Sequence, residues 1–336
     1  MTRTASIAAL VLLAGCGGSS SPSAATPTHH TPGPLADTWA WDGGAWHQTA
    51  NTGPARRYSA SLAYDAARGV YIMFGGQTAR ATSDETWSWD GKTWKELSPA
   101  HKPPPRRAAA MAYDPVHRVV VLYGGVVPDA AEGFDASDTW TWDGSDWTVA
   151  VEKSTDPGPR EGPLMVTAGN RVLLFGGRYY NVKYYGDAWT WDGKTWSRVD
   201  RAPEPPGRAS SALVWDPVNS SLLVFGGTGL NATAGPGAQG ALLGDFWSLA
   251  GSAWKQITAA GPPAQGFTNA IWDSGRKRAV VLLGMPCPQP SGDEWAWDGA
   301  AWSKTASGIS PRWGAASAQN PDGSALIFGG SDEAGC

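Results

Sequence analysis

A repeat constrains the fold of this chain more than any other feature. The first half of each unit reads D-x-W-x-W-D-G-x-x-W or a close variant of it. The six copies are Asp37–Trp46, Glu85–Trp94, Asp138–Trp147, Asp187–Trp196, the degraded Asp245–Trp254, and Asp293–Trp302. A chain that repeats one unit in this way builds the same small structure many times and stacks the copies on one another.

The second half of each unit is an apolar run that ends in Gly-Gly. The runs end at Gly76, Gly125, Gly177, Gly227, a degraded Met285, and Gly330. Successive ends lie 45 to 58 residues apart, which is the period of a four-stranded propeller blade rather than of a helical repeat. The 43 Gly and 26 Pro residues also favour short strands joined by turns, because both residue types are costly in helices.

Each unit predicts two hairpins. The indoles of W-x-W fall on one face of a strand, and Asp-Gly makes a tight turn into a returning strand that carries the third Trp. Segments such as Ala63–Asp65 and Val70–Gly76 predict two inner strands that neighbouring blades cover on both faces. Of the 20 Trp residues, 17 belong to outer hairpins, so we interpret them as packing residues. Trp215 and Trp272 stand at the positions of Tyr64 and Tyr113.

These motifs resemble the kelch motif from Asp37 to Gly330. The resemblance implies an all-β fold, a kelch-type β-propeller of four-stranded blades around a central channel. The repeat predicts six blades. The chain opens with outer strands and ends with inner strands, so six outer halves pair with six inner halves. Residues 312–330 are then expected to pair with residues 37–46 and close the ring, so that 37–336 form one domain and a monomer. An incomplete ring that needs a partner chain is the alternative.

The N-terminal segment predicts where the protein is located. Residues 1–15 contain a short apolar run typical of a signal peptide. Leu13-Ala14-Gly15-Cys16 resembles the lipobox of bacterial lipoproteins, which implies a lipid on Cys16, a flexible linker over residues 16–36, and an extracytoplasmic, membrane-anchored domain. An ordinary secretory signal with an incidental cysteine is the alternative.

The charge of the chain bears on the class of its partner, and two cysteines bear on a possible disulfide. The formal net charge is −4 and only 17% of residues are charged, which argues against a nucleic-acid partner. Cys287 and Cys336 follow the Gly-Gly positions of consecutive units, so they are expected on one face of adjacent blades. Outside the cytoplasm they predict a disulfide, with two unpaired thiols as the alternative.

Arginines precede the predicted inner strands in five of the six units. We take Arg57, Arg107, Arg160, Arg208 and Arg312 as candidate ligand-binding residues, while Gln265 stands in the degraded unit. Such arginines predict a ring at the channel mouth for a carboxylate, a sulfate or an acidic sugar. The alternative is structural: each arginine bonds backbone carbonyls or the Asp of the motif.

Residues outside the repeat are further candidates for the same face. Tyr58 and Trp313 follow these arginines in two units, with ligand contact or local packing as their possible roles. The loop 178–186 adds Arg178, Tyr179, Tyr180 and Tyr184, a patch typical of recognition surfaces that otherwise lies over the next blade. A second loop, 126–137, holds Asp129, Glu132 and Asp135 without an ordered Ca²⁺-ligand spacing, so we expect a solvated loop.

No catalytic constellation emerges from the sequence, and we predict no metal and no cofactor. Some kelch propellers resemble galactose oxidase, whose copper needs two His, but His47, His101 and His117 do not converge. The first hypothesis is therefore a binding module for a protein, a glycan or a small anionic ligand. The second is a metal-free carbohydrate enzyme, similar to a sialic-acid mutarotase. An enzyme is expected to show a channel pocket with a carboxylate in hydrogen-bond reach of Arg160, Arg208 or Arg312.

Overall fold

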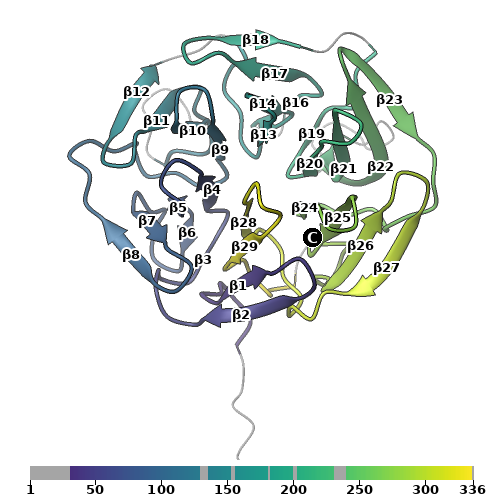
Figure 1. Cartoon of the computed structure of the whole chain (residues 1–336), viewed down its shortest axis with the longest axis horizontal. Helices are drawn as coiled ribbons and strands as arrows, with labels where there is room; N and C mark the ends of the chain where they lie inside the picture. The colour runs from purple at the N-terminus through teal and green to yellow at the C-terminus, as the bar shows by residue number, and fades with distance from the viewer. Residues whose placement is uncertain are drawn as a thin grey trace, which may run out of the picture. The chain divides into compact units, whose positions relative to one another are not determined.

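The computed structural model describes residues 31–128, 135–152, 156–180, 182–199, 203–230 and 240–334. These residues form strands and turns and contain no helix. Their strands build six antiparallel sheets of four main strands, set radially around a central channel (Figure 1). The chain is therefore the six-bladed, all-β propeller that the repeat predicts. All six blades lie in one compact unit, Pro32–Cys336.

The two ends of the described chain share one blade. Its strands are β1 (Thr38–Trp41), β2 (Trp46–Ala50), β28 (Ala316–Gln319) and β29 (Ala325–Phe328). The order is β2-β1-β29-β28, with Thr38 opposite Phe328, which confirms the predicted closure. The folded part begins earlier than Asp37, because the amide of Leu35 donates to the carbonyl of Gly330 at 2.8 Å.

Five further blades follow along the chain, each ordered from the channel outward. The first two are β4 (Ser61–Asp65), β5 (Val70–Phe74), β7 (Thr86–Trp89), β8 (Trp94–Leu97), and β9 (Ala110–Asp114), β10 (Val119–Tyr123), β11 (Thr139–Trp142), β12 (Trp147–Val151). The next two are β13 (Leu164–Ala168), β14 (Arg171–Phe175), β17 (Ala188–Trp191), β18 (Trp196–Arg198), and β20 (Ala212–Asp216), β21 (Ser221–Gly229), β22 (Ala241–Ala250), β23 (Ala253–Ile257). The last is β24 (Asn269–Asp273), β25 (Arg278–Leu282), β26 (Asp293–Trp297), β27 (Trp302–Ala306).

Short strands add pairings beside the blades. They are β3 (Arg57–Tyr58) with β6 (Gln77–Thr78), β15 (Arg178–Tyr179) with β16 (Lys183–Tyr184), and β19 (Arg208–Ala209) with β21. The first and last pairings, and the bridge between Glu161 and Arg178, join a segment before an inner strand to a segment after Gly-Gly. These two sets of loops therefore share one face of the propeller.

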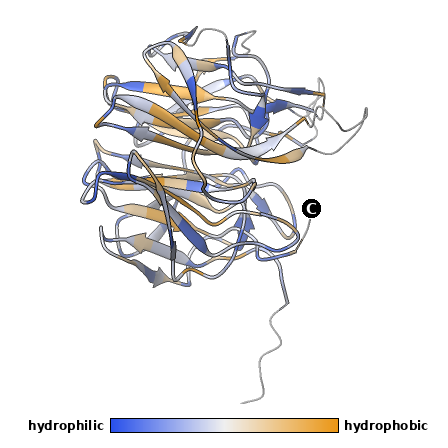
Figure 2. Ribbon diagram, turned by 90° about the vertical axis from the view of Figure 1, so that its right-hand side faces the viewer, coloured by the Kyte–Doolittle hydropathy of each residue, from blue (hydrophilic) through white to orange (hydrophobic). Residues whose placement is uncertain are grey.

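The hydrophobic core lies between adjacent blades, and hydrophobic residues follow the strands (Figure 2). The third Trp of a unit reaches the blade before it. For example, the Trp94 Nε1–H donates to Thr38 Oγ1 at 2.8 Å, and the Trp147 Nε1–H donates to Thr86 Oγ1 at 3.0 Å. These indoles seal the interface between blades, which supports their interpretation as packing residues.

The degraded unit corrects one predicted boundary. Leu283 and Gly284, rather than a pair ending at Met285, take the place of Gly-Gly. The Gly284 amide donates to the carbonyl of Arg312 at 2.9 Å, just as the Gly76 amide donates to that of Arg106. Leu283 has φ 62°, the left-handed conformation that Gly75 adopts at the equivalent position with φ 71°. This hydrogen bond between neighbouring blades thus places the end of the Gly-Gly position one residue earlier than the sequence alone suggests.

Candidate functional site

A ring of backbone hydrogen bonds frames one end of the central channel. Each member donates its amide to the carbonyl of the member before it at 2.7 to 3.3 Å, and the first donates to the last. All members have φ between 53° and 62°. They are Ser59, Ala108, Gly162, Ser210, Phe267 and Gly314, one from each blade. The residues just before this ring form the channel mouth.

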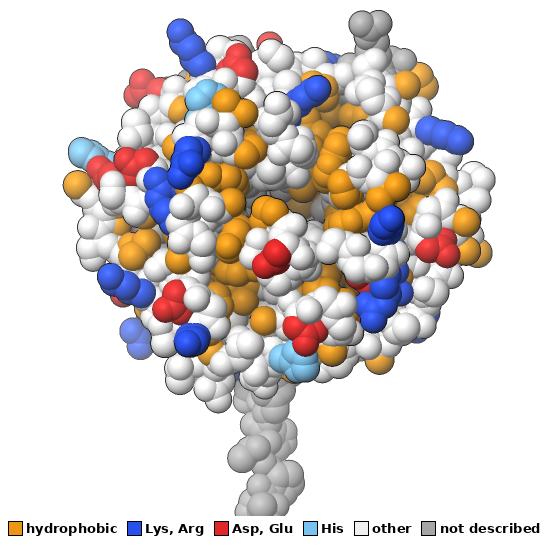
Figure 3. Space-filling model, in the orientation of Figure 1, with side chains coloured by type: hydrophobic (Ala, Val, Ile, Leu, Met, Phe, Trp, Pro, Cys, Tyr) orange, Lys and Arg blue, Asp and Glu red, His pale blue; other side chains and the backbone are white. Residues whose placement is uncertain are grey.

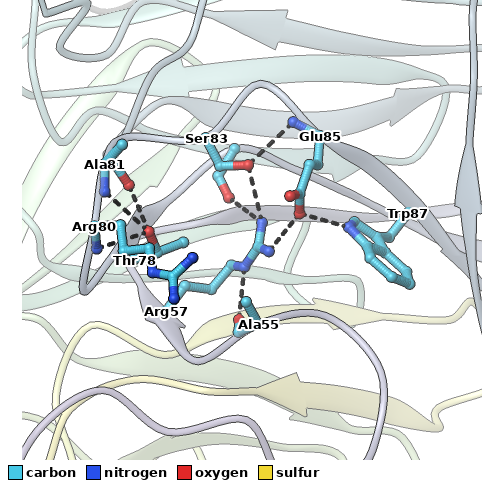
Figure 4. Close-up of polar contacts among 9 residues, drawn as sticks. Ala55, Arg57, Thr78, Arg80, Ala81, Ser83, Glu85 and Trp87 are labelled. Atoms are coloured by element: carbon cyan, nitrogen blue, oxygen red, sulfur yellow. Dashed lines mark hydrogen bonds and ion pairs between the residues drawn. The ribbon is translucent and has the colours of Figure 1, made fainter.

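The arginines before the ring are built into the blades. Arg57 is fully buried, and its Nη1 donates to the carbonyl of Gly75 at 2.9 Å while Nη2 pairs with Glu85 at 2.5 Å (Figure 4). Glu85 also accepts a hydrogen bond from Trp87 Nε1 at 2.9 Å. One arginine therefore joins the inner strands, the Gly-Gly turn and the first Trp of the motif.

The same arrangement recurs in four other blades. The pairs are Arg106–Asp138 at 2.6 Å, Arg160–Asp187 at 2.8 Å, Arg208–Asp245 at 2.7 Å and Arg312–Asp37 at 2.6 Å. The prediction of an open arginine ring is corrected for Arg57, Arg160, Arg208 and Arg312, because all four are 0% exposed. A buried guanidinium needs a paired acid inside the protein. The structural alternative, in which each arginine bonds backbone carbonyls or the acid of the motif, therefore describes these residues.

Arg107 differs from these buried arginines. Arg106 takes the buried position in this blade, so Arg107 lies one position later and its side chain is partly exposed at the mouth, where its role as a ligand-binding residue stays a prediction. Arg107 Nη1 lies 3.1 Å from Glu161 Oε1, and Arg178 Nη2 lies 2.8 Å from Glu161 Oε2. Glu161 thus bridges two cations that the sequence places in different blades.

Three aromatic side chains lie together on the opposite side of the mouth. The Tyr58 and Trp313 rings have centroids 5.0 Å apart, and Phe267 lies 5.3 Å from Trp313. All three are partly exposed. Sequence reasoning missed Phe267, although one signal was available: the equivalent position holds only Ser, Ala or Gly in the other five blades.

One part of the loop 178–186 is exposed at the surface, and another part packs against the next blade, so both predicted placements occur. Tyr179 and Tyr180 are partly exposed, with ring centroids 4.5 Å apart, and the Tyr180 amide donates to Asp135 Oδ2 at 2.7 Å. Burial raises the pKa of that Asp135 carboxyl. Tyr184 packs against the next blade, since a Cβ on Gly240 would lie 2.4 Å from its hydroxyl.

We call the partly exposed residues around the ring the mouth surface. It consists of Tyr58, Arg107, Glu161, Arg178, Tyr179, Tyr180, Phe267 and Trp313. Six of these eight residues are among the predicted ligand candidates. Because most of them differ from one blade to the next, they are free of the requirements that the repeat places on the blade core.

Several predicted residues fall outside the described residues: Cys16, Asp129, Glu132 and Cys336. Cys287 is disulfide-bonded, and its partner cysteine also lies outside them, so the pairing with Cys336 stays a prediction. His47 on β2 contacts Asp42, His101 contacts Asp146, and His117 contacts Asp114, so the three histidines contact three different acids. Within the described ranges, no three His, Cys, Asp or Glu side chains group as metal ligands, and no helix suits a membrane crossing.

The channel itself forms a cavity of about 550 Å³ between the six inner strands. No charged side chain of the described chain lines it. The carboxylates in reach of Arg160, Arg208 and Arg312 belong to the motif acids inside the blades, so the described cavity lacks the acid and arginine pair expected of an enzyme.

A comparison with protein families now gives the identity of the repeat. The family model of the KLHDC2/KLHL20/DRC7 Kelch-repeats domain matches residues 36–200 and, in a second overlapping match, residues 92–272. Together the matches span more than half of the chain. This chain belongs to the kelch-repeat family. A search of curated proteins gives no match. Kelch propellers commonly act as protein-interaction modules.

Proposed function

We propose that this kelch propeller is a protein-interaction module, held outside the cytoplasm by a lipid on Cys16, and that its mouth surface contacts the partner. One observation carries the proposal. The arginines that repeat with the fold are enclosed in the blades, whereas Tyr58, Phe267 and Trp313 depart from the repeat and remain partly exposed beside the ring. Solvent-accessible aromatic residues in a rigid frame are typical anchors of protein interfaces.

A protein partner fits the charges of the mouth surface better than a small anion or an acidic glycan does. Arg107 and Arg178 share Glu161, so the cations at the mouth already have a counter-charge. An anion would have to compete with that carboxylate for both guanidinium groups. A protein surface can instead cover the aromatic side chains and leave the ion pairs at its solvated rim, where they add specificity.

The test places a photo-crosslinking amino acid at Trp313 in the full chain and, as a control, at Val149. Val149 is 42% exposed on the outer strand β12, far along the blade from the channel. We expect Trp313 alone to crosslink a discrete protein. Trp313→Ala should then weaken the purified complex by a factor of about 30, the effect of losing a central hot-spot residue, while Val149→Ala leaves it unchanged. Equal crosslinking from both positions contradicts the proposal, and crosslinking to glycan alone assigns the other ligand class.

The anchoring part of the proposal has its own test. It is supported by the lipobox-like Leu13–Cys16 and by the Gly/Ser/Pro-rich segment that follows. Two or more acyl chains anchor a protein stably, because each buried CH₂ contributes about 0.8 kcal/mol. Cys16→Ser should move the protein from the membrane fraction to the soluble extracytoplasmic fraction, without altering its thermal unfolding. A variant that stays in the membrane fraction contradicts lipidation at Cys16. The closed ring supports a monomer, which sedimentation equilibrium measures directly.

A further inference from the structure

The N-terminal end of the propeller lies beside the mouth surface. Residues 33–35 run antiparallel to residues 330–332, and two of their amides donate hydrogen bonds to these residues at 2.7 and 2.8 Å. Within this pairing Pro34 bridges to Ser331, which bridges in turn to Trp313. A single segment of backbone therefore separates the start of the propeller from an aromatic residue of the mouth surface.

This start lies on the mouth face of the propeller. The Leu35 carbonyl accepts a hydrogen bond of 3.0 Å from the amide of Arg57, which precedes an inner strand, while Ser331 follows a Gly-Gly turn. The start thus contacts both sets of loops that frame the mouth. The opposite face carries the inner turns, such as residues 115–118 between β9 and β10. Figure 3 shows that opposite face, where hydrophobic side chains surround a central hollow.

The chain between Cys16 and the propeller is too short to treat both faces alike. Gly33 stands 17 positions after Cys16, and a Gly/Ser/Pro-rich chain of this length has an r.m.s. span of about 20–25 Å. Turning the opposite face to the membrane adds the height of a blade to that path, and the strand β9 alone spans about 17 Å. A lipid on Cys16 therefore holds the mouth face toward the membrane.

The charges of the mouth surface favour a protein partner over the lipid headgroups themselves. Arg107 Nη1 lies 3.1 Å from Glu161 Oε1, and Arg178 Nη2 lies 2.8 Å from Glu161 Oε2. Basic residues bind anionic headgroups through their free charge, at about 1 kcal/mol for each residue near the surface. Because these two cations already share an acid, the membrane surface alone gains little at the mouth.

We propose that the mouth surface faces the membrane and binds an integral protein of that same membrane. The orientation rests on the proposed function, since it requires the lipid on Cys16 and the contact at Trp313. A tethered propeller meets such a protein at an effective concentration in the mM range, as short flexible linkers give. A soluble protein gains no such concentration and has to enter the gap of about 20–25 Å that the linker leaves.

Energy transfer measures the orientation of the lipidated full chain on phosphatidylcholine vesicles whose headgroups carry an acceptor dye. A fluorescent amino acid replaces either Val182, 76% exposed in the loop after Gly177, or Val116, 59% exposed in an inner turn of the opposite face. We expect the donor at Val182 to lie closer to the bilayer than the donor at Val116 by about 17 Å, the length of an inner strand. Equal distances, or a closer Val116, overturn the proposal.

Crosslinking from Trp313 in cells identifies the class of partner. The crosslinked protein should resist alkaline extraction from the membrane, as integral proteins do. A Gly/Ser insertion that triples the chain length between Cys16 and Gly33 should lower the effective concentration about five-fold. Soluble Cys16→Ser protein should then displace the crosslink at a concentration about five-fold lower. The same Gly/Ser sequence appended to the C-terminal end is the control and should change nothing.

The outcomes distinguish this proposal from the proposed function. A crosslink to a soluble protein, or a displacement that the insertion leaves unchanged, overturns the membrane partner but leaves the interaction module intact. A crosslink to lipid alone assigns the mouth surface to the bilayer and also overturns the proposal. Absence of any crosslink from Trp313 contradicts the proposed function itself and overturns the membrane partner with it.

Discussion

Asp37 and Arg312 are 275 residues apart in the chain, yet their side chains meet at 2.6 and 2.8 Å in a bidentate ion pair. Asp37 precedes the first outer strand and Arg312 precedes the last inner strand, so the pair lies inside the blade that closes the ring. Arg312 Nη1 also donates to the carbonyl of Gly329 at 3.0 Å, and the Arg312 carbonyl accepts from Gly284 of the preceding blade. One fully buried arginine thus connects both ends of the propeller with the neighbouring blade.

Removing the charge of Asp37 should open this closure. Asp37→Asn keeps the shape of the side chain but leaves the guanidinium of Arg312 buried without a counter-charge, so we expect a loss of about 3–5 kcal/mol in the free energy of unfolding. Urea denaturation measures the loss. As a control, Lys102→Ala removes an exposed ion pair with Asp84 and should cost less than about 1 kcal/mol. Similar effects of the two variants would mean that the closure pair contributes little.

Acid should destabilise the propeller through the same pairs. Burial would raise the pKa of Asp37 and Asp245, but hydrogen bonds and the charges of Arg312 and Arg208 hold the pKa below the ordinary value of 3.8. The folded pKa is therefore lower than the unfolded pKa, and each pair contributes its full stability above the unfolded value. That contribution is lost as the pH falls from 3.8 through the folded pKa. Thermal unfolding across this range should depend less steeply on pH in Asp37→Asn than in the wild type; equal slopes contradict the assignment.

The degraded blade should accept the arginine that it lacks. Gln265 is buried at the position of the five arginines, and the acid of its blade, Asp293, pairs with exposed Lys304 at 2.8 Å. Gln265→Arg places a guanidinium beside Asp293 and the carbonyl of Leu283, and we expect it to raise the unfolding free energy by about 1 kcal/mol. The double variant with Asp293→Asn should be less stable than the wild type, since the new charge is then unpaired. A destabilised single variant contradicts the equivalence of the site.

The hydrogen-bonded ring should favour glycine at its non-glycine members. Ala108 has φ 53°, a conformation that Gly162 and Gly314 occupy at equivalent positions. A left-handed conformation costs an L-residue about 1–2 kcal/mol, and glycine loses about 0.5–1 kcal/mol of backbone entropy, so Ala108→Gly should stabilise by up to about 1 kcal/mol. The matched Ala110→Gly, in the extended strand β9, should instead destabilise by about 1 kcal/mol. Chemical denaturation of both variants distinguishes the two signs, and a loss in both contradicts the strain.

The adjacent residues Arg106 and Arg107 show which part of the candidate site the sequence predicts and which part it does not. Arg106 and Arg107 have the same chemistry, so the sequence alone offers both for one position. Spacing does not resolve them. Arg57, Arg106 and Arg208 stand 18 residues before the glycine whose carbonyl they bind, but Arg160 and Arg312 stand 16 and 17 residues before theirs, and Arg107 would stand 17 residues before Gly124. Phe267 was missed because the degraded unit obscures its register.

The channel illustrates a second limit. Trp215, Trp272, Tyr64 and Tyr113 are correctly aligned by the repeat, but the alignment says nothing of what they face across the channel. Asn269 looks like an ordinary substitution in one strand. Its partners come from the next blade, because its amide nitrogen donates to the carbonyl of Ala315, just before β28, and to Ser317 on β28.

The sequence by itself determined the blade, the number of blades and the way the ring closes. Each of these follows from short-range patterns, such as the spacing of the indoles, the Asp-Gly turn and the phase at which the repeat starts. The tertiary structure alone decided which arginines are enclosed, which side chains form the mouth surface and how the channel wall is composed. These features depend on contacts between residues of different blades, and burial decides the role of a charged side chain only once the neighbouring blade is in place.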